Sequence, residues 1–225
     1  MMFIEDEKNL SVKEAKKEKK QIYVIEAQKP NGGRIYRMVK RMVDIFVSVV
    51  AGIVCAPVMI ILAIMIRIDS PGRALFCQER LGKDGKPFYI YKFRTMYENS
   101  EENGPVWART DDDRCTKIGS FLRKCRLDEL PQLYNIFVGQ MSIVGPRPER
   151  AFFYEKFEEY IHGFKNRLAV TPGLTGLAQV NGGYDLEPEE KIIYDMEYIK
   201  TRNLWLDFKI ILKTVMVVFK REGAK

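Results

Sequence analysis

Two adjacent acids, Asp128 and Glu129, stand in the stretch RLDELPQLYNIFVGQMSIVGPRPER, residues 126–150. Successive residues of a helix point about 100° apart, so the two carboxylates cannot do the same work. One of them could attack as a nucleophile while the other binds a metal ion. A carboxylate that attacks a diphosphate meets a strongly negative electrophile, and the reaction therefore needs cations such as Mg²⁺ and arginine.

Cationic side chains are close by in the sequence. Arg147 stands between two prolines in GPRPE. Because proline restricts the backbone, the guanidinium would be held in place for a bidentate phosphate contact. A surface arginine in a rigid turn is the alternative interpretation. Other basic residues near the acids are Arg123, Lys124 and Arg126.

The acids precede apolar residues at three- and four-residue intervals, which predict a helix over about 130–138 with its apolar face inward. Pro131 is tolerated in the first turn of a helix, so Asp128 would fall near the N-cap. Asp128 could then be no more than a cap, with Glu129 favourable to the helix dipole. The local pattern leaves the catalytic and the structural interpretation open.

An uncharged stretch of 22 residues, 45–66, lies upstream of the acids. As one helix it would reach about 33 Å, enough for a hydrocarbon core of about 30 Å. Pro57 removes a backbone donor in its interior and predicts a bend. Five basic residues lie at 29–41 and five at 67–86, so the positive-inside rule assigns no orientation. A spanning helix and a re-entrant hairpin both remain open.

Turn residues and apolar periodicity predict the other elements. Residues 1–33 read as a mobile charged arm, and PFYIYKF, residues 87–93, as one strand of a β-hairpin. The C-terminal helix, residues 204–221, is amphipathic and could lie on a bilayer or pack on the core. The remaining helices are predicted at 116–126, 149–168 and 187–201.

The net charge of +7 and the pI near 9.1 suit nucleic acid, an anionic membrane or a phosphorylated small molecule. A nucleic-acid partner is disfavoured because no recognition motif occurs and the basic residues concentrate beside the apolar stretch. Four cysteines without a C-x-x-C pair and a single histidine give no sign of a zinc ribbon or a Cys/His catalytic pair. Residues 1–20 do not resemble a secretory signal, so we expect the chain to begin in the cytoplasm.

Five motifs follow the proline-bearing apolar stretch in a fixed order: KFRTM, LRKCRLDELPQLYN, MSIVGPRPE, TPGLTGLAQVNG and YIKTRNLWLDFKIILKT. Over residues 34–222 the chain closely resembles the bacterial sugar transferases, the monotopic polyprenyl-phosphate phosphoglycosyl transferases. The resemblance divides the chain into an arm (1–33), a membrane-anchoring helix broken at Pro57 (34–67) and a catalytic domain (68–225).

The resemblance implies a two-step reaction with a covalent intermediate. The acid that matches Asp128 attacks the β-phosphate of a UDP-sugar and releases UMP, and a polyprenyl phosphate then takes the phosphosugar from the enzyme. The cofactor implied is Mg²⁺, bound at Glu129 and Asp128. The residues implied to bind substrate phosphates are Lys92, Arg94, Arg123 and Arg147.

The same resemblance implies a predominantly helical α+β fold with a re-entrant N-terminal helix hairpin and interfacial amphipathic helices. The protein would lie on the cytoplasmic face of the bacterial inner membrane, with both ends cytoplasmic, and act in exopolysaccharide, capsule or glycoconjugate assembly. Membrane lipids are further expected partners, and a homo-oligomer is left open. The residues implied to anchor the chain in the membrane are Lys40, Arg41, Asp44 and Pro57.

Three residues depart from the family's pattern. Ala56 stands where a serine usually precedes the proline, Gln140 where an acid precedes MS, and Gly183 where an arginine follows NG. Without an arginine at 183, a contact to the donor is either lost or supplied elsewhere, with Arg150 or Arg167 as candidates. A catalytically inactive, membrane-anchored scaffold of a glycan assembly complex is the alternative function.

Overall fold

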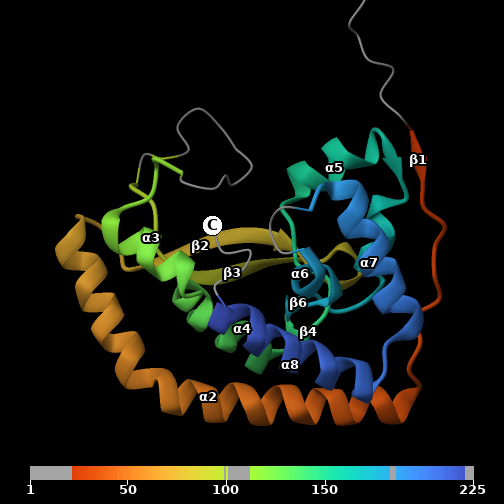
Figure 1. The fold of residues 1–225 in the computed structure, drawn as a ribbon, viewed down its shortest axis with the longest axis horizontal. Coiled ribbons are helices and arrows are strands. Elements are labelled where there is room, and N and C mark those ends of the chain that lie inside the picture. The colour runs from red at the N-terminus through yellow and green to blue at the C-terminus, as the bar shows by residue number, and fades with distance from the viewer. Residues whose placement is uncertain (1–21, 99, 101–111, 183–185, 221–225) are drawn as a thin grey trace, which may run out of the picture.

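The computed structural model describes residues 22–98, 100, 112–182 and 186–220. These residues form a mainly helical α+β structure (Figure 1), as the sequence predicts. The α-helices are α2 (Arg34–Asp69), α3 (Lys117–Lys124), α4 (Leu133–Val138), α5 (Ala151–Glu158), α6 (Leu177–Gly182), α7 (Pro188–Thr201) and α8 (Leu204–Lys220). The 3-10 helices are η1 (Lys83–Gly85), η2 (Leu127–Gln132) and η3 (Phe164–Ala169). The strands are β1 (Tyr23–Val24), β2 (Leu75–Leu81), β3 (Pro87–Phe93), β4 (Ser142–Val144), β5 (Ile161–His162) and β6 (Gly173–Thr175).

Helix α2 contains the whole apolar stretch and has Pro57 in its interior. Figure 1 shows α2 as two arms that meet at an angle, which is the bend predicted from the missing N–H of Pro57. The helix bends without breaking into two. By length and composition, α2 is the one helix in the described part of the chain that could cross a membrane.

The first arm of α2 is held against the domain by a buried polar cluster around Asp207 of α8. Lys40 Nζ lies 2.9 Å from Asp207 Oδ2, and the Tyr36 hydroxyl donates to the same oxygen at 2.9 Å. The Tyr198 hydroxyl of α7 donates to Asp207 Oδ1 at 2.8 Å. The charge of Lys40, predicted as a membrane anchor, is therefore directed into the protein.

Two further predicted anchors, Arg41 and Asp44, also contact the domain. Arg41 donates to the carbonyls of Ile136 and Phe137 in the last turn of α4, at 2.7 and 2.6 Å. Asp44 is buried, and its Oδ1 accepts the backbone N–H of Ile143 in β4 at 3.0 Å. These contacts join α2 to the elements that follow the acids, whereas their predicted role as lipid anchors remains a prediction.

The predicted β-hairpin is confirmed. Strands β2 and β3 pair antiparallel from Leu75 opposite Phe93 to Leu81 opposite Pro87, and β3 covers PFYIYKF, residues 87–93. The turn needs left-handed backbone at Asp84 and Gly85, with φ angles of 58° and 73°. The hairpin lies beside η2 and brings residues of both strands towards the two acids.

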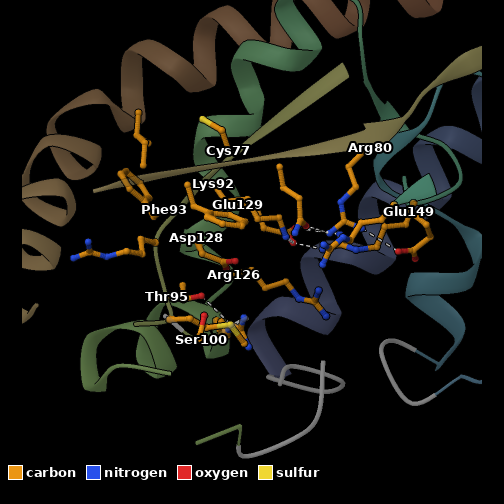
Figure 2. A pocket seen from close by; sticks show the side chains of 18 of the residues that line it. Cys77, Arg80, Lys92, Phe93, Thr95, Ser100, Arg126, Asp128, Glu129 and Glu149 are labelled. Carbon is orange, nitrogen blue, oxygen red and sulfur yellow. Dashed lines mark hydrogen bonds and ion pairs between the residues drawn. The ribbon is translucent and has the colours of Figure 1, made fainter. Parts of the chain in front are cut away.

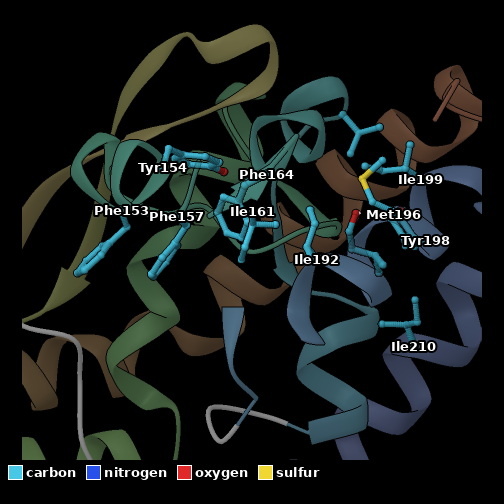
Figure 3. Close-up of a cluster of buried hydrophobic side chains, with 12 residues drawn as sticks. Phe153, Tyr154, Phe157, Ile161, Phe164, Ile192, Met196, Tyr198, Ile199 and Ile210 are labelled. Carbon is cyan, nitrogen blue, oxygen red and sulfur yellow. Dashed lines mark hydrogen bonds between the residues drawn. The ribbon is translucent and has the colours of Figure 1, made fainter. Parts of the chain in front are cut away.

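The largest hydrophobic core lies under α5, η3 and α7 (Figure 3). Stacked and edge-on aromatic rings of Phe153, Phe157 and Phe164 make up one part of it. A smaller cluster packs the second arm of α2 against β3 and α3; its buried members are Leu62, Ile66, Phe93 and Leu122. The hairpin and η2 belong to this smaller cluster through Phe93, Leu127 and Leu130.

A close backbone crossing joins the MSIVGPRPE and TPGLTG motifs. Strands β4 and β6 pair in parallel, with Ser142 opposite Gly173 and Val144 opposite Thr175. A Cβ at Gly173 would lie 2.1 Å from the backbone nitrogen of Gly145, so only glycine fits there. This crossing sets the direction in which the chain continues to Arg147.

The described part of the N-terminal arm packs against the domain, whereas the sequence predicts a mobile segment. Strand β1 pairs in parallel with β5, with Tyr23 opposite Ile161. Asn31 accepts a hydrogen bond from Arg202 Nε on its carbonyl, and its own backbone nitrogen donates to Ile199. Residues 22–33 therefore pack along the domain, while residues 1–21 lie outside the described part of the chain.

The predicted helix at 149–168 is divided in the structure. Helix α5 ends at Glu158, and the chain continues through β5 into η3. Gly163, with φ of 95°, turns the chain between β5 and η3 in the left-handed region that ends helices. The division matters because it places Arg167 of η3 in the core beside Tyr154 and Phe164.

Candidate active site

A cavity of about 740 Å³ lies between the β-hairpin, α3, η2 and the segment that follows β4. Among the described residues, eleven basic and four acidic side chains line it, so it favours an anionic ligand. Figure 2 shows Asp128 and Glu129 in this cavity, with Arg80 and Glu149 on one side of them and Phe93 and Thr95 on the other. The cationic lining is Arg73, Arg80, Lys92, Arg94, Arg114, Arg123, Arg126, Arg147, Arg150, Arg167 and Lys191.

The two acids lie on a 3-10 turn and not at the start of an α-helix. Arg126, with φ of 57°, adopts the left-handed conformation and starts η2. Pro131 lies inside η2, and the α-helix begins only afterwards, at Leu133. The predicted helix start is thus wrong. The N-cap of η2 is Arg126 and not Asp128, and the Arg126 side chain makes no capping hydrogen bond. The capping interpretation of Asp128 therefore fails.

Glu129 is buried and doubly ion-paired. Lys92 Nζ of β3 lies 3.0 Å from its Oε1, and the guanidinium of Arg147 contacts both of its carboxylate oxygens. Burial raises the pKa of Glu129, but Arg147 and Lys92 outweigh it and hold that pKa well below its usual range. Glu129 is an anion at neutral pH. It holds Lys92 and Arg147, which were both predicted to bind phosphate.

Asp128 is as buried as Glu129, with 7% of each residue exposed, but the contacts of its carboxylate differ. Its carboxylate makes no hydrogen bond or ion pair with the residues that the structure describes. Burial raises the pKa of Asp128, Lys92 lowers it, and the charge of Glu129 raises it further, with a net increase. An unpaired carboxylate among cations is suited to nucleophilic attack on a phosphorus atom.

The backbone of Arg147 is held in place by an ion pair that the sequence did not predict, Arg167 with Asp195. Arg167 Nη2 donates to the Arg147 carbonyl at 3.0 Å. The same nitrogen lies 2.6 Å from Oδ2 of Asp195 in α7, and both side chains are buried. No motif marks Asp195, and its partner is 28 residues away, so only the fold brings the pair together. Arg167, one of the two candidates to replace an arginine at position 183, is therefore engaged within the protein.

The two other residues that were predicted to bind phosphate, Arg123 and Arg94, differ in their contacts. Arg123 of α3 donates from Nε to the Thr95 hydroxyl at 2.9 Å and lines the cavity. Arg94 is 7% exposed and donates to the Ser70 carbonyl and hydroxyl at 2.7 and 2.8 Å, and to the Pro71 carbonyl at 2.8 Å. Arg94 thus ties the C-terminal end of α2 to the cavity wall, which occupies most of its donors.

The described residues contain no group of three or more His, Cys, Asp or Glu side chains placed to hold a metal. Mg²⁺ is commonly held by only one or two carboxylates together with substrate phosphates. Asp128 and Glu129 supply two adjacent carboxylates in the cavity, so the residues present fit an ion that arrives with a phosphorylated ligand.

The departures from the family's pattern have different consequences. Gln140 accepts a hydrogen bond on Oε1 from Asn135 Nδ2 at 2.8 Å, so its amide supplies the acceptor that an acid would supply. Ala56 lies in α2 one residue before Pro57 and provides no hydroxyl at the bend. Gly183 lies outside the described residues.

A cationic cavity around two buried carboxylates, next to a long apolar helix, defines a site for a phosphorylated ligand. The chain belongs to the bacterial sugar transferase family, whose model matches residues 35–221.

Three relatives have names that describe sugar phosphate transfer. The chain is 42% identical over 194 residues to UDP-N-acetylgalactosamine-undecaprenyl-phosphate N-acetylgalactosaminephosphotransferase of Aeromonas hydrophila, covering 85% of this chain and 46% of the relative. It is 43% identical over 190 residues to UDP-glucose:undecaprenyl-phosphate glucose-1-phosphate transferase of Klebsiella pneumoniae, covering 82% of this chain and 41% of the relative. A Caulobacter vibrioides protein of the same name is 40% identical over 192 residues, covering 82% of this chain and 71% of that protein. The chain thus spans less than half the length of the first two relatives.

Proposed function

We propose that this protein transfers a sugar 1-phosphate from a UDP-sugar to a polyprenyl phosphate, at the cytoplasmic face of the bacterial inner membrane. The observation that carries the proposal is the buried and unpaired carboxylate of Asp128 within a cationic cavity. The names of the relatives support the donor and acceptor classes. Exopolysaccharide, capsule or glycoconjugate assembly is the pathway class that such a product would enter.

In the first step an oxygen of Asp128 attacks the β-phosphorus of the UDP-sugar. The bond between that phosphorus and the bridging oxygen breaks, and UMP leaves with the bridging oxygen. Arg123 and Arg147 face the cavity and neutralise the developing charge on the phosphate oxygens. Asp128 and Glu129 would hold Mg²⁺, which would supply further charge neutralisation.

In the second step a phosphate oxygen of the lipid attacks the same phosphorus. The acyl phosphate bond to Asp128 breaks, the carboxylate is regenerated, and the product is a lipid-linked sugar diphosphate. Glu129 binds Lys92 and Arg147 in the structure and so positions both cations beside Asp128. Covalent storage of the phosphosugar lets UMP leave before the lipid enters.

The contacts of α2 support a re-entrant placement in the membrane. Its first arm is fastened to the domain by Lys40 and Asp44, and its C-terminal end by Arg94. Both ends of the apolar stretch are therefore attached to the same domain. A straight helix that spans the membrane would instead place them on opposite sides of a hydrocarbon core about 30 Å thick.

Helix α8 supports a position at the membrane surface. Asp207 and Ile210 are buried against the domain, so one face packs on the core. The opposite face leaves a row of large apolar side chains exposed, as in helices that lie in a bilayer interface. The exposed members are Leu204, Trp205, Phe208, Leu212, Val215 and Met216.

The proposal is tested by intact-protein mass spectrometry after incubation with Mg²⁺ and a series of UDP-sugars, without lipid. We expect a phosphosugar adduct in the wild type and none in Asp128→Asn. The matched control is Asp84→Asn, because Asp84 lies in the exposed hairpin turn, where asparagine accepts the same backbone. An adduct that persists in Asp128→Asn would refute the nucleophile, and no adduct with any donor would favour the inactive scaffold.

A further inference from the structure

The cavity differs in character on the two sides of Asp128. On one side, Arg80 of β2 is engaged by Glu149 at 3.2 Å and by Gln78 at 2.7 Å, so this side is polar and its charges are paired. On the other side the wall is formed by the first residues of β2, where Leu75 is 48% and Phe76 43% exposed. An exposed apolar wall inside a cationic cavity points to a ligand with an apolar part.

This apolar wall continues from the membrane helix. Helix α2 ends at Asp69, and β2 begins at Leu75, six residues later. The final turns of α2 expose Ile64 by 54% and Ile68 by 80%. Arg94 binds the carbonyls that follow the helix and lines the same cavity, so the end of α2 is fixed at the cavity rim.

Two cations at this end have donors available. Arg73 lines the cavity and makes no hydrogen bond or ion pair with the residues that the structure describes. Arg123 uses Nε for Thr95, and its other guanidinium nitrogens make no bond to a described residue. Lys92 and Arg147, by contrast, are engaged by Glu129. The apolar wall and the unpaired cations together match a phosphate attached to a hydrocarbon chain.

We propose that the phosphate and the first isoprene units of the polyprenyl phosphate bind along the start of β2, between Arg73 and Phe76, and reach Asp128 from the end of α2. The polar side around Arg80 and Glu149 then receives the nucleotide of the donor. This assignment rests on the proposed function, because it divides one cavity between the two substrates of that reaction.

The first test separates the two half-reactions. The double substitution Leu75→Ser/Phe76→Ser removes the apolar surface that would bind the isoprene units, and we expect the KM for polyprenyl phosphate to rise about tenfold or more. The burst of UMP in the absence of lipid should stay within about twofold of the wild type, because the chemistry of Asp128 is unchanged. Tyr89→Ser is the matched control, since Tyr89 lies on the same hairpin, is 56% exposed and does not line the cavity.

The second test uses the native thiol of Cys77, which follows Phe76 in β2, is exposed and lines the same cavity. Alkylation by N-ethylmaleimide, followed by intact mass, should be slowed by polyprenyl phosphate and not by the UDP-sugar. Cys77→Ser identifies the label at this site.

The outcomes distinguish this inference from the proposed function. A reduced UMP burst with an unchanged KM for the lipid, or protection of Cys77 by the UDP-sugar alone, would place the donor on this wall and overturn the inference. Unchanged half-reactions in the double variant would also overturn it. A wild type that releases no UMP would refute the proposed function itself.

Discussion

Arg167 binds the main chain of Arg147: its Nη2 donates to the Arg147 carbonyl at 3.0 Å. The same guanidinium pairs with Asp195 of α7 at 2.6 Å, with exposures of 2% and 1% for the two side chains. Arg147 in turn binds both carboxylate oxygens of Glu129. A buried ion pair in the core thus supports the position of an arginine in the cavity, with prolines on both sides of Arg147 limiting its backbone further.

Replacement of Asp195 by alanine is expected to destabilise the fold by about 3–5 kcal/mol, because it leaves Arg167 charged, buried and unpaired. Glu197→Ala on the same helix is the control, since Glu197 is exposed. Thermal unfolding of the detergent-solubilised proteins measures the difference. An Asp195→Ala variant that unfolds at the wild-type temperature would show that the ion pair does not contribute to the fold.

The rate of UMP release should depend on the ionisation of Asp128. Its carboxylate attacks only when deprotonated, and burial raises its pKa above the ordinary value, so the rate rises with pH through this raised pKa. Lys92 lowers the pKa of Asp128, so in Lys92→Met the rise moves to higher pH. Glu129 raises that pKa, so in Glu129→Gln the remaining activity rises at lower pH.

Burst rates of UMP release across pH, without lipid, test these opposite shifts. Lys86→Met is the control, because Lys86 is exposed on the hairpin outside the cavity, and its profile should match the wild type. Shifts of both variants in the same direction would contradict the assignment of the pH dependence to Asp128.

Local signals predicted the elements that depend on neighbouring residues alone. The hairpin strand at 87–93 follows from its β-prone residues and flanking turns, and the bend of α2 follows from Pro57. The adjacent acids Asp128 and Glu129 suggested the candidate site, although the local pattern left a purely structural role open. Their different environments did not follow, because the partners of Glu129 come from β3 and from the segment after β4.

Contacts between distant segments are what the sequence did not predict. Arg94 shares the KFRTM motif with Lys92, yet the end of α2 approaches it and takes up its donors. The charged residues beside the apolar stretch suggested lipid headgroups, but Lys40 meets Asp207, 167 residues later. The sequence alone does not show which charged side chains the fold directs into the protein.

Asp44 tests whether the inward contacts of α2 matter more for docking than for anchoring. In Asp44→Leu the buried N–H of Ile143 loses its acceptor, which should cost about 1–3 kcal/mol of stability. Association with membranes should persist, because the apolar surface of α2 remains. Asp44→Asn keeps an acceptor oxygen and is the matched control. Release of Asp44→Leu from sedimented membranes, with unchanged thermal unfolding, would support an anchoring role instead.

Gly119 provides a steric test of how α3 is positioned, and Gly52 of α2 provides its control. A Cβ at Gly119 would lie 2.0 Å from the carbonyl oxygen of Thr95, so Gly119→Ala must push α3 away from that backbone. We expect a loss of about 1–3 kcal/mol and slower UMP release, since Arg123 on α3 is held by the Thr95 hydroxyl. Gly52→Ala in α2 meets nothing within 4 Å and should gain up to about 1 kcal/mol from helix propensity. Equal thermal unfolding of the two variants would show that the close approach of α3 to Thr95 can relax without cost.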